Sequence, residues 1–225
     1  MCFEWGESVN IGIWKTLAVP TLALATSTGL IVGATPGLAG AKGNTATPDP
    51  NGTLKLGFAA TPPIWDPARA PVTSAAYTFL TPVYDRLLGL GSDLSIKPQL
   101  ATSYQLAADR RSMTLKLRTD VTFQDGTKFD ASAVVANFNR VKALNPPTVS
   151  AALPLIGSVT AVDSSTVRFD FTADGTTFPT LLSSGTSNVL SMMVSPAAFA
   201  NPAKLATSPA GWGPYKLTSQ TQTTA

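Results

Sequence analysis

The sequence predicts a mixed α/β fold, because two hairpin patterns flank one amphipathic helix pattern. Residues 103–106 and 113–118 form the first predicted hairpin, and residues 159–162 and 166–172 form the second. In both, apolar residues alternate with polar ones at a period of two, which is typical of strands with one buried face. Residues 131–144 instead place Val134, Phe138 and Val141 four and three positions apart, which predicts a helix with one buried stripe.

Further elements are predicted from capping and chain-breaking residues. Residues 53–59 alternate in hydrophobicity and predict a first strand, which a proline-rich segment ends. Residues 75–88 predict a helix with a kink or a restart at Pro82 and a C-terminal cap at Gly89. Asp130 is the predicted N-cap of the 131–144 helix, and Asn145-Pro146-Pro147 should end it. Two short helices are also predicted, with Pro179 and Pro196 in their first turns, and Ser195 should be the N-cap of the second.

The composition excludes several classes of function. The chain has 225 residues with 44% hydrophobic content, which is enough for one globular unit. It contains no histidine, and its one cysteine is Cys2, so serine–histidine catalysis, disulfides and thiolate zinc sites cannot be built. Only 13% of residues are charged, for a net charge of +3, and no stretch concentrates Lys or Arg, which argues against nucleic acid as a partner. We therefore expect no enzyme, no cofactor and no metal site.

The N-terminal segment predicts export. Residues 16–41 carry no charge and end in Ala39-Gly40-Ala41, a small-x-small site of the kind that signal peptidases accept. We interpret residues 1–41 as a signal peptide and the polar residues 42–52 as a flexible linker. The alternative is a membrane-spanning helix, although its prolines and small residues make the segment weakly apolar. The expected location is periplasmic or at the cell surface, with membrane contact only through the signal or an anchor.

Several motifs resemble, in order, the family 5 extracellular solute-binding proteins, which serve ABC importers for oligopeptides, dipeptides and nickel. The strongest match runs from Leu100-Ala101-Thr102-Ser103-Tyr104 through Phe123-Gln124-Asp125-Gly126 to the 131–144 helix. Two departures are Gln124, where the family usually has histidine, and Trp212, where it usually has threonine. The flanking matches are Trp65-Asp66-Pro67, Val83-Tyr84-Asp85-Arg86-Leu87 and Gly211-Trp212-Gly213-Pro214-Tyr215.

This resemblance implies a fold, a ligand class and partners. The fold would be that of a type II periplasmic binding protein, with residues 53–217 as a partial first lobe that carries an inserted β-rich subdomain. The second lobe would be absent, and residues 218–225 would be a polar tail. The family binds peptides or similar small solutes as monomers, by lobe closure, and delivers them to a membrane permease of an ABC transporter. A chain without its second lobe should bind solute weakly or not at all.

Three residues are candidates for solute contact. Trp65 and Asp66 follow the first predicted strand, where α/β folds place ligands, and Trp212 offers a stacking face between two glycines. The structural alternatives are that Trp65 packs under its proline-rich loop and that 211–215 is a crossover turn into the next strand. Tyr84 should be a core aromatic whose hydroxyl has a local partner. Asp120, Asp125 and Asp130 fit solvated turns and a helix cap better than a cation site.

Two other hypotheses remain open. The chain could be an exported structural or adhesive β-rich domain without a transport role, which would have paired sheet edges rather than exposed ones. A membrane-anchored hydrolase that uses a carboxylate pair is the third hypothesis.

Overall fold

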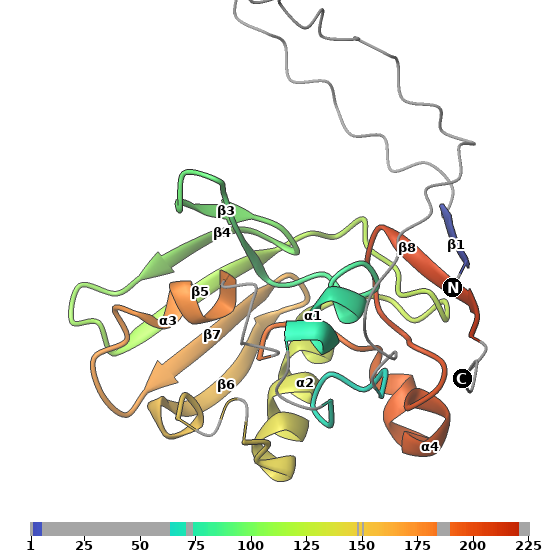
Figure 1. Ribbon diagram of the computed structural model, residues 1–225. Coiled ribbons are helices and arrows are strands. Elements are labelled where there is room, and N and C mark those ends of the chain that lie inside the picture. Colours follow the sequence, from blue (N-terminus) through green and yellow to red (C-terminus); the bar gives the residue numbers. More distant parts are fainter. Residues whose placement is uncertain are drawn as a thin grey trace, which may run out of the picture. The chain divides into compact units, whose positions relative to one another are not determined.

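The computed structural model describes residues 2–5, 64–70, 74–147, 149, 151–183 and 190–220, all of which belong to one compact unit. Its centre is a four-stranded antiparallel sheet in the order β4-β5-β7-β6 (Figure 1). The strands are β4 (Ala101–Leu106), β5 (Ser112–Leu117), β6 (Ile156–Asp163) and β7 (Thr166–Phe171). Both predicted hairpins are therefore confirmed, and β4 and β6 each begin earlier than predicted.

The sheet has one buried and one solvated face. Met113 and Leu115 of β5 and Val167 and Phe169 of β7 are almost fully buried. On the other face, Arg168 binds Asp170 two positions along the same strand, in contact with water. The period-two alternation in the sequence therefore reports directly on which side of the sheet the core lies.

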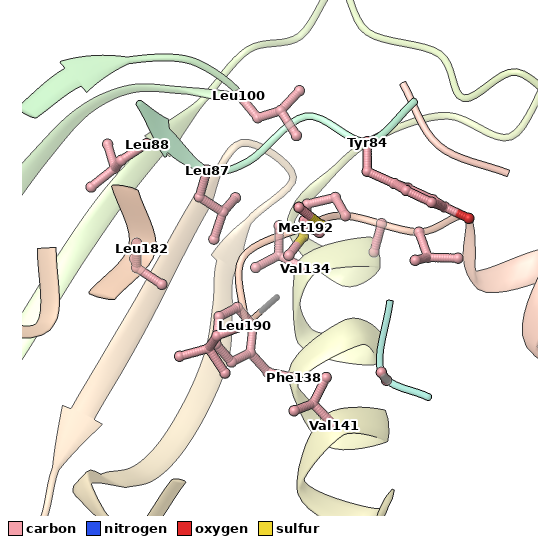
Figure 2. Packing of buried hydrophobic residues seen from close by; sticks show 14 of the residues in the cluster. Tyr84, Leu87, Leu88, Leu100, Val134, Phe138, Val141, Leu182, Leu190 and Met192 are labelled. Carbon is pink, nitrogen blue, oxygen red and sulfur yellow. The ribbon is translucent and has the colours of Figure 1, made fainter. Parts of the chain in front are cut away.

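Helix α2 (Ala131–Leu144) packs on the buried face, beside β6 and β7. The Asp130 carboxylate accepts a hydrogen bond from the Ala133 amide at 2.9 Å, which confirms the predicted N-cap. The ring of Phe138 meets Phe169 edge to face, with 4.9 Å between centroids. Figure 2 shows Val134, Phe138 and Val141 converging with Leu190 and Met192 in the core. The single apolar stripe of the helix is thus what fixes it to the sheet.

Other helical segments complete the unit. These are α1 (Ser74–Leu80), η1 (Leu153–Leu155), α3 (Phe178–Ser183), η2 (Pro196–Ala200) and α4 (Pro202–Leu205). Phe178 of α3 packs against Phe169 and Phe171, so α3 and α2 share the buried face of the sheet. The predicted short helices at Pro179 and Pro196 are confirmed. Ser195 is the N-cap residue of η2, as predicted, although its hydroxyl makes no capping hydrogen bond.

The predicted helix over residues 75–88 is wrong beyond Leu80. Residues 81–83 form a turn, and the chain continues into β2 (Leu88–Leu90), which pairs with β3 (Ile96–Pro98) in a hairpin that the sequence pattern did not predict. Pro82 explains the difference, since it lacks an amide hydrogen and cannot continue an α-helix without distortion. Gly89 consequently lies in a strand rather than at a helix cap.

The chain also contains a two-stranded pair of β1 (Cys2–Trp5) and β8 (Tyr215–Ser219), which are antiparallel. The predicted strand 53–59, the linker 42–52 and most of the predicted signal lie outside the described residues, and those assignments stay predictions. In the described part of the chain, no helix has the length and apolar character needed to cross a bilayer.

Candidate functional site

Trp65 is fully buried and held by three hydrogen bonds. Its amide donates to the Ala206 carbonyl at 3.0 Å, and its indole Nε1 donates to Gln220 Oε1 at 2.6 Å. Its carbonyl accepts from the Tyr84 hydroxyl at 2.7 Å, which supplies the local partner expected for that tyrosine. Burial raises the pKa of Tyr84 far above its usual value, so this hydroxyl stays protonated and remains a donor.

Asp66 is also fully buried, and its carboxylate is bound by other parts of the same chain. The guanidinium of Arg140 on α2 bonds both oxygens, at 3.0 Å to Oδ1 and with a short contact to Oδ2. Arg69 Nε lies 3.6 Å from Oδ2, and the Ala68 amide donates to Oδ1 at 3.2 Å. Arg140 additionally lies 4.8 Å over the Phe199 ring. Asp66 thus joins the segment after the first predicted strand to the central helix.

The glycines around Trp212 allow a close approach of two backbones. A Cβ on Gly211 would lie 2.2 Å from the Val83 carbonyl oxygen, and one on Gly213 would lie 2.4 Å from that of Pro82. The Tyr215 amide then donates to the Pro82 carbonyl at 3.0 Å as β8 begins. The glycines are therefore required by packing within the chain, as the crossover-turn alternative expects.

Trp212 itself is half-buried, and the guanidinium of Arg118 lies 4.8 Å from the centre of its ring. Arg118 is fixed in turn by Asp120, whose oxygens accept hydrogen bonds at 2.9 and 2.6 Å. This ion pair confirms Asp120 as a surface residue bound within the chain. One side of the Trp212 ring is thus covered by a cation of the same chain.

The structure joins the Trp65 and Trp212 segments through Tyr84. Its hydroxyl binds the Trp65 carbonyl, and its ring lies where a Cβ on Gly211 would approach to 2.5 Å. Figure 2 shows the hydroxyl end of Tyr84 directed away from the Leu87–Leu100 part of the core. The three candidate residues therefore lie around one buried tyrosine. Their contact with solute stays a prediction.

Asp85, next to Tyr84, is an unusual carboxylate that the sequence pattern did not single out. Gln99 Nε2 donates to its Oδ1 at 2.8 Å. Burial raises the pKa of Asp85 to about 6, against the opposing effects of the Gln99 hydrogen bond and the nearby positive charges of Arg86 and Arg118. Asp85 and Gln99 are far apart in sequence and meet only because β2 and β3 form a hairpin, so no local pattern predicts them.

Asp125 lies in a tight turn with Gly126, as the expected place of Asp125 in a solvated turn predicts. Asp125 Oδ1 accepts from the Thr127 amide at 3.0 Å, and Gly126 has φ of 86°. Gln124 makes two hydrogen bonds to the segment that leads into β8. Its backbone amide donates to the Gly211 carbonyl and its side-chain Nε2 donates to the Tyr215 carbonyl, both at 2.9 Å. Its Oε1 is buried and has no hydrogen-bond partner.

A cavity of about 550 Å³ opens beside Gln124. Its walls are the 124–127 turn, the η2–α4 segment with the residues that follow it, and β8. Trp65, Asp66 and Trp212 do not line it. Among the described residues, no group of His, Cys, Asp and Glu side chains is arranged to hold a metal ion.

Comparison with known proteins gives a consistent family. Residues 95–225 match the sequence pattern of the bacterial extracellular solute-binding proteins, family 5 Middle. Glutathione-binding protein GsiB of Escherichia coli K12 is 35% identical over 144 residues, which is 62% of this chain and 27% of GsiB. The homologue from Salmonella paratyphi A matches to the same extent. The chain thus spans about a quarter of the length of the curated relatives it matches.

Solved structures show the same fold. MoaA of A. tumefaciens R10, in complex with mannopinic acid, is 27% identical with a TM-score of 0.63, over 71% of this chain and 33% of MoaA. NikA of Brucella suis, in complex with Fe(III)-EDTA, is 28% identical with a TM-score of 0.59, over 72% of this chain and 33% of NikA.

DppA of Helicobacter pylori, in complex with the peptide STSA, is 25% identical with a TM-score of 0.61, over 70% of this chain and 35% of DppA. The predicted mixed α/β fold of a type II periplasmic binding protein, present in part, is therefore confirmed. With more than half of its residues inside the family pattern, the chain belongs to the family 5 bacterial extracellular solute-binding proteins.

Proposed function

We propose that this chain is part of the substrate-binding component of an ABC importer for peptides or related small solutes. The observation that carries the proposal is the family match over residues 95–225, together with folds shared with proteins solved in complex with a peptide or with mannopinic acid. Such a component captures solute by closing two lobes around it and has no reaction to catalyse. It works outside the cytoplasm as a monomer and delivers its solute to the membrane permease.

The proposed organisation follows the predicted one. Residues 1–41 direct export, residues 42–52 form a linker, residues 53–217 provide the partial first lobe, and a short polar tail follows. Extended peptides are held largely through their backbones, with side chains in roomy pockets, so the binding protein needs few charged groups for specificity. In this scheme Trp65, Asp66 and Trp212 contribute to the solute-facing side of the lobe.

Because the lobes share the solute, this chain by itself should bind peptides weakly or not at all. Isothermal titration of the full chain against glutathione and a mixture of short peptides tests this expectation. Micromolar binding by the chain alone would contradict the need for a second lobe.

A chimera tests the function itself. The segment of Escherichia coli GsiB that matches this chain, 27% of its length, is replaced by the corresponding residues of this chain. We expect the chimera to unfold cooperatively and to bind glutathione or a short peptide at micromolar concentration. A chimera that unfolds cooperatively but binds none of these solutes would refute the proposal, and parent GsiB serves as the control.

A further inference from the structure

Strand β6 forms one edge of the four-stranded sheet, as its last place in the order β4-β5-β7-β6 requires (Figure 1). Residues 157–162 of this strand include no charged side chain and no proline, and Val162 is 61% exposed. Charges, prolines or a covering segment usually protect an edge strand, because its unpaired backbone groups can bind another strand. Strand β6 therefore lacks most of the usual protection.

Lys142 of α2 protects only one end of this edge. Its Nζ donates to the carbonyls of Ile156 and Gly157, at 3.2 and 3.1 Å. Within the described part of the chain, no other hydrogen bond reaches the outer edge of β6 between Gly157 and Asp163. The middle of the strand is thus open.

The hydrogen bonds of β7 show which of its backbone groups face β5 and which face β6. The Phe171 amide donates to the Arg111 carbonyl at 2.8 Å, on the β5 side. Just before β7, the Ser165 carbonyl accepts from the Leu117 amide of β5, also at 2.8 Å. Because backbone groups alternate along a strand, the odd-numbered residues of β7 bind β5 and the even-numbered ones bind β6.

This alternation identifies the open groups of β6. Ser158 and Thr160 lie opposite even-numbered residues of β7, so their backbones are bonded within the sheet. Val159 and Ala161 lie opposite odd-numbered residues, so their N–H and C=O groups point away from the sheet. The outer edge therefore offers two donors and two acceptors in a regular strand arrangement.

This arrangement is complementary to itself. When two copies of β6 run antiparallel with Thr160 opposite Thr160, Val159 of each copy lies opposite Ala161 of the other. These are hydrogen-bonded pairs, so each exchanges two backbone bonds. Thr160 then forms the closer pair without hydrogen bonds, in which the two side chains meet. All the open groups of Val159 and Ala161 are satisfied in this register.

The charges at the ends of the strand are also complementary. In the same register, Asp163 of one copy lies opposite Gly157 of the other, where Lys142 of that other copy binds the carbonyl. Lys142 is exposed and forms no ion pair with any described residue of its own chain, and the Asp163 side chain is 51% exposed. The two-fold symmetry places a second such pair at the other end. Opposite charges meet at both ends, and no like charges face each other.

We propose that β6 is an interaction surface for a second copy of this chain, which pairs with it strand to strand and joins the two sheets into one. Both copies use the same residues about a two-fold axis, so this contact closes at two copies. A contact of one strand with another is small, so the association is reversible, and single copies remain the form that delivers solute. The inference rests on the edge of the sheet and is independent of the proposed function.

Sedimentation equilibrium of the full chain tests the pairing. The parent chain should form dimers at about 100 µM, because contacts of this size are weak. Thr160→Lys and Thr160→Glu each place like charges directly opposite one another, so each variant alone should dimerise about tenfold more weakly. An equal mixture of the two variants should recover the dimer, because opposite charges then meet. A parent chain that stays monomeric at about 0.5 mM, or a mixture that dimerises no better than the separate variants, would overturn the proposal.

Gln105→Lys is the matched control. Gln105 is exposed on β4, at the opposite edge of the sheet, and cross-strand pairing through Thr114 and Arg168 places it on the same face as Thr160. This variant should dimerise as the parent chain does, and thermal unfolding checks that every variant folds. A loss of dimer in Gln105→Lys equal to that in Thr160→Lys would refute the assignment to β6.

Discussion

The guanidinium of Arg140 forms a bidentate ion pair with the carboxylate of Asp66, which lies 74 residues earlier in the chain. The Asp66 side chain is fully buried, and that of Arg140 is 14% exposed. The pair anchors the segment after the first predicted strand to α2, while Arg140 also covers the Phe199 ring. One arginine thus connects three parts of the chain that are distant in sequence.

Asp66→Asn should lower the free energy of unfolding by about 3–5 kcal/mol, because it leaves the Arg140 charge largely buried without its counter-charge. Urea unfolding measures the loss. Asp170→Asn is the matched control, since it breaks the exposed pair with Arg168 and should cost less than about 1 kcal/mol. Equal losses in the two variants would show that Asp66 contributes no more than a surface charge.

Asn137 on α2 is the second polar anchor of the core. Its Nδ2 donates to the Val194 carbonyl at 2.7 Å and its Oδ1 accepts from the Val194 amide at 3.0 Å, as a neighbouring strand would. Asn137→Ala removes both bonds, so it should destabilise the fold by about 2–3 kcal/mol in urea unfolding. Asn139→Ala, two positions along on the exposed side of the same helix, should cost well under 1 kcal/mol. A similar loss in both variants would contradict this role.

These two anchors mark the limit of what the sequence could predict. The hairpins and α2 follow from hydrophobic periodicity, because burial on one face imposes the period on the residues themselves. Asp130 and Gly126 were also predictable, because a helix cap and a tight turn are local.

The candidate site depends on contacts across the fold. Three such contacts join residues that no regular spacing in the sequence relates, so no local pattern could predict them. They are Asp66 with Arg140, Asn137 with Val194, and Gln99 with Asp85. The helix over residues 75–88 was predicted too long because the apolar spacing continues past Pro82, so that an interruption was expected there rather than the end of the helix. A family resemblance supplied the architecture that local patterns could not.

The close approach at Gly211 predicts a large cost for the smallest added side chain. In Gly211→Ala the new Cβ would meet the Val83 carbonyl and the Tyr84 ring, which must move to admit it. We expect a loss of about 2–3 kcal/mol in urea unfolding, since overpacking strains the surrounding backbone. Gly89→Ala is the control, because a Cβ there meets its nearest neighbour at an ordinary 3.7 Å and should change stability by less than about 1 kcal/mol. A near-neutral Gly211→Ala would show that this segment can separate from the 82–84 turn.

Asp85 should make stability depend on pH in the opposite direction from an exposed carboxylate such as Asp174, whose pKa the fold lowers. Its pKa is about 6 in the fold against 3.8 for the ordinary side chain, so the native state binds the proton more tightly than the unfolded state. Its contribution is therefore most favourable below about pH 4 and is lost as the pH rises through 6, by about 3 kcal/mol at most.

Asp85→Asn keeps an oxygen for Gln99 Nε2 but removes the buried charge, so the variant should melt at a higher temperature than the parent chain at pH 8. This advantage should shrink steadily as the pH falls from 7 to 4, measured by thermal unfolding of both proteins at each pH. Asp174→Asn is the control, for which stability should change with pH in the opposite direction. Hydrogen bonds from Thr176 lower the pKa of the exposed Asp174, so removing this carboxylate should lower stability at pH 8 and not at low pH. If the difference in melting temperature between Asp85→Asn and the parent chain stays constant from pH 4 to 8, burial does not raise the pKa of Asp85.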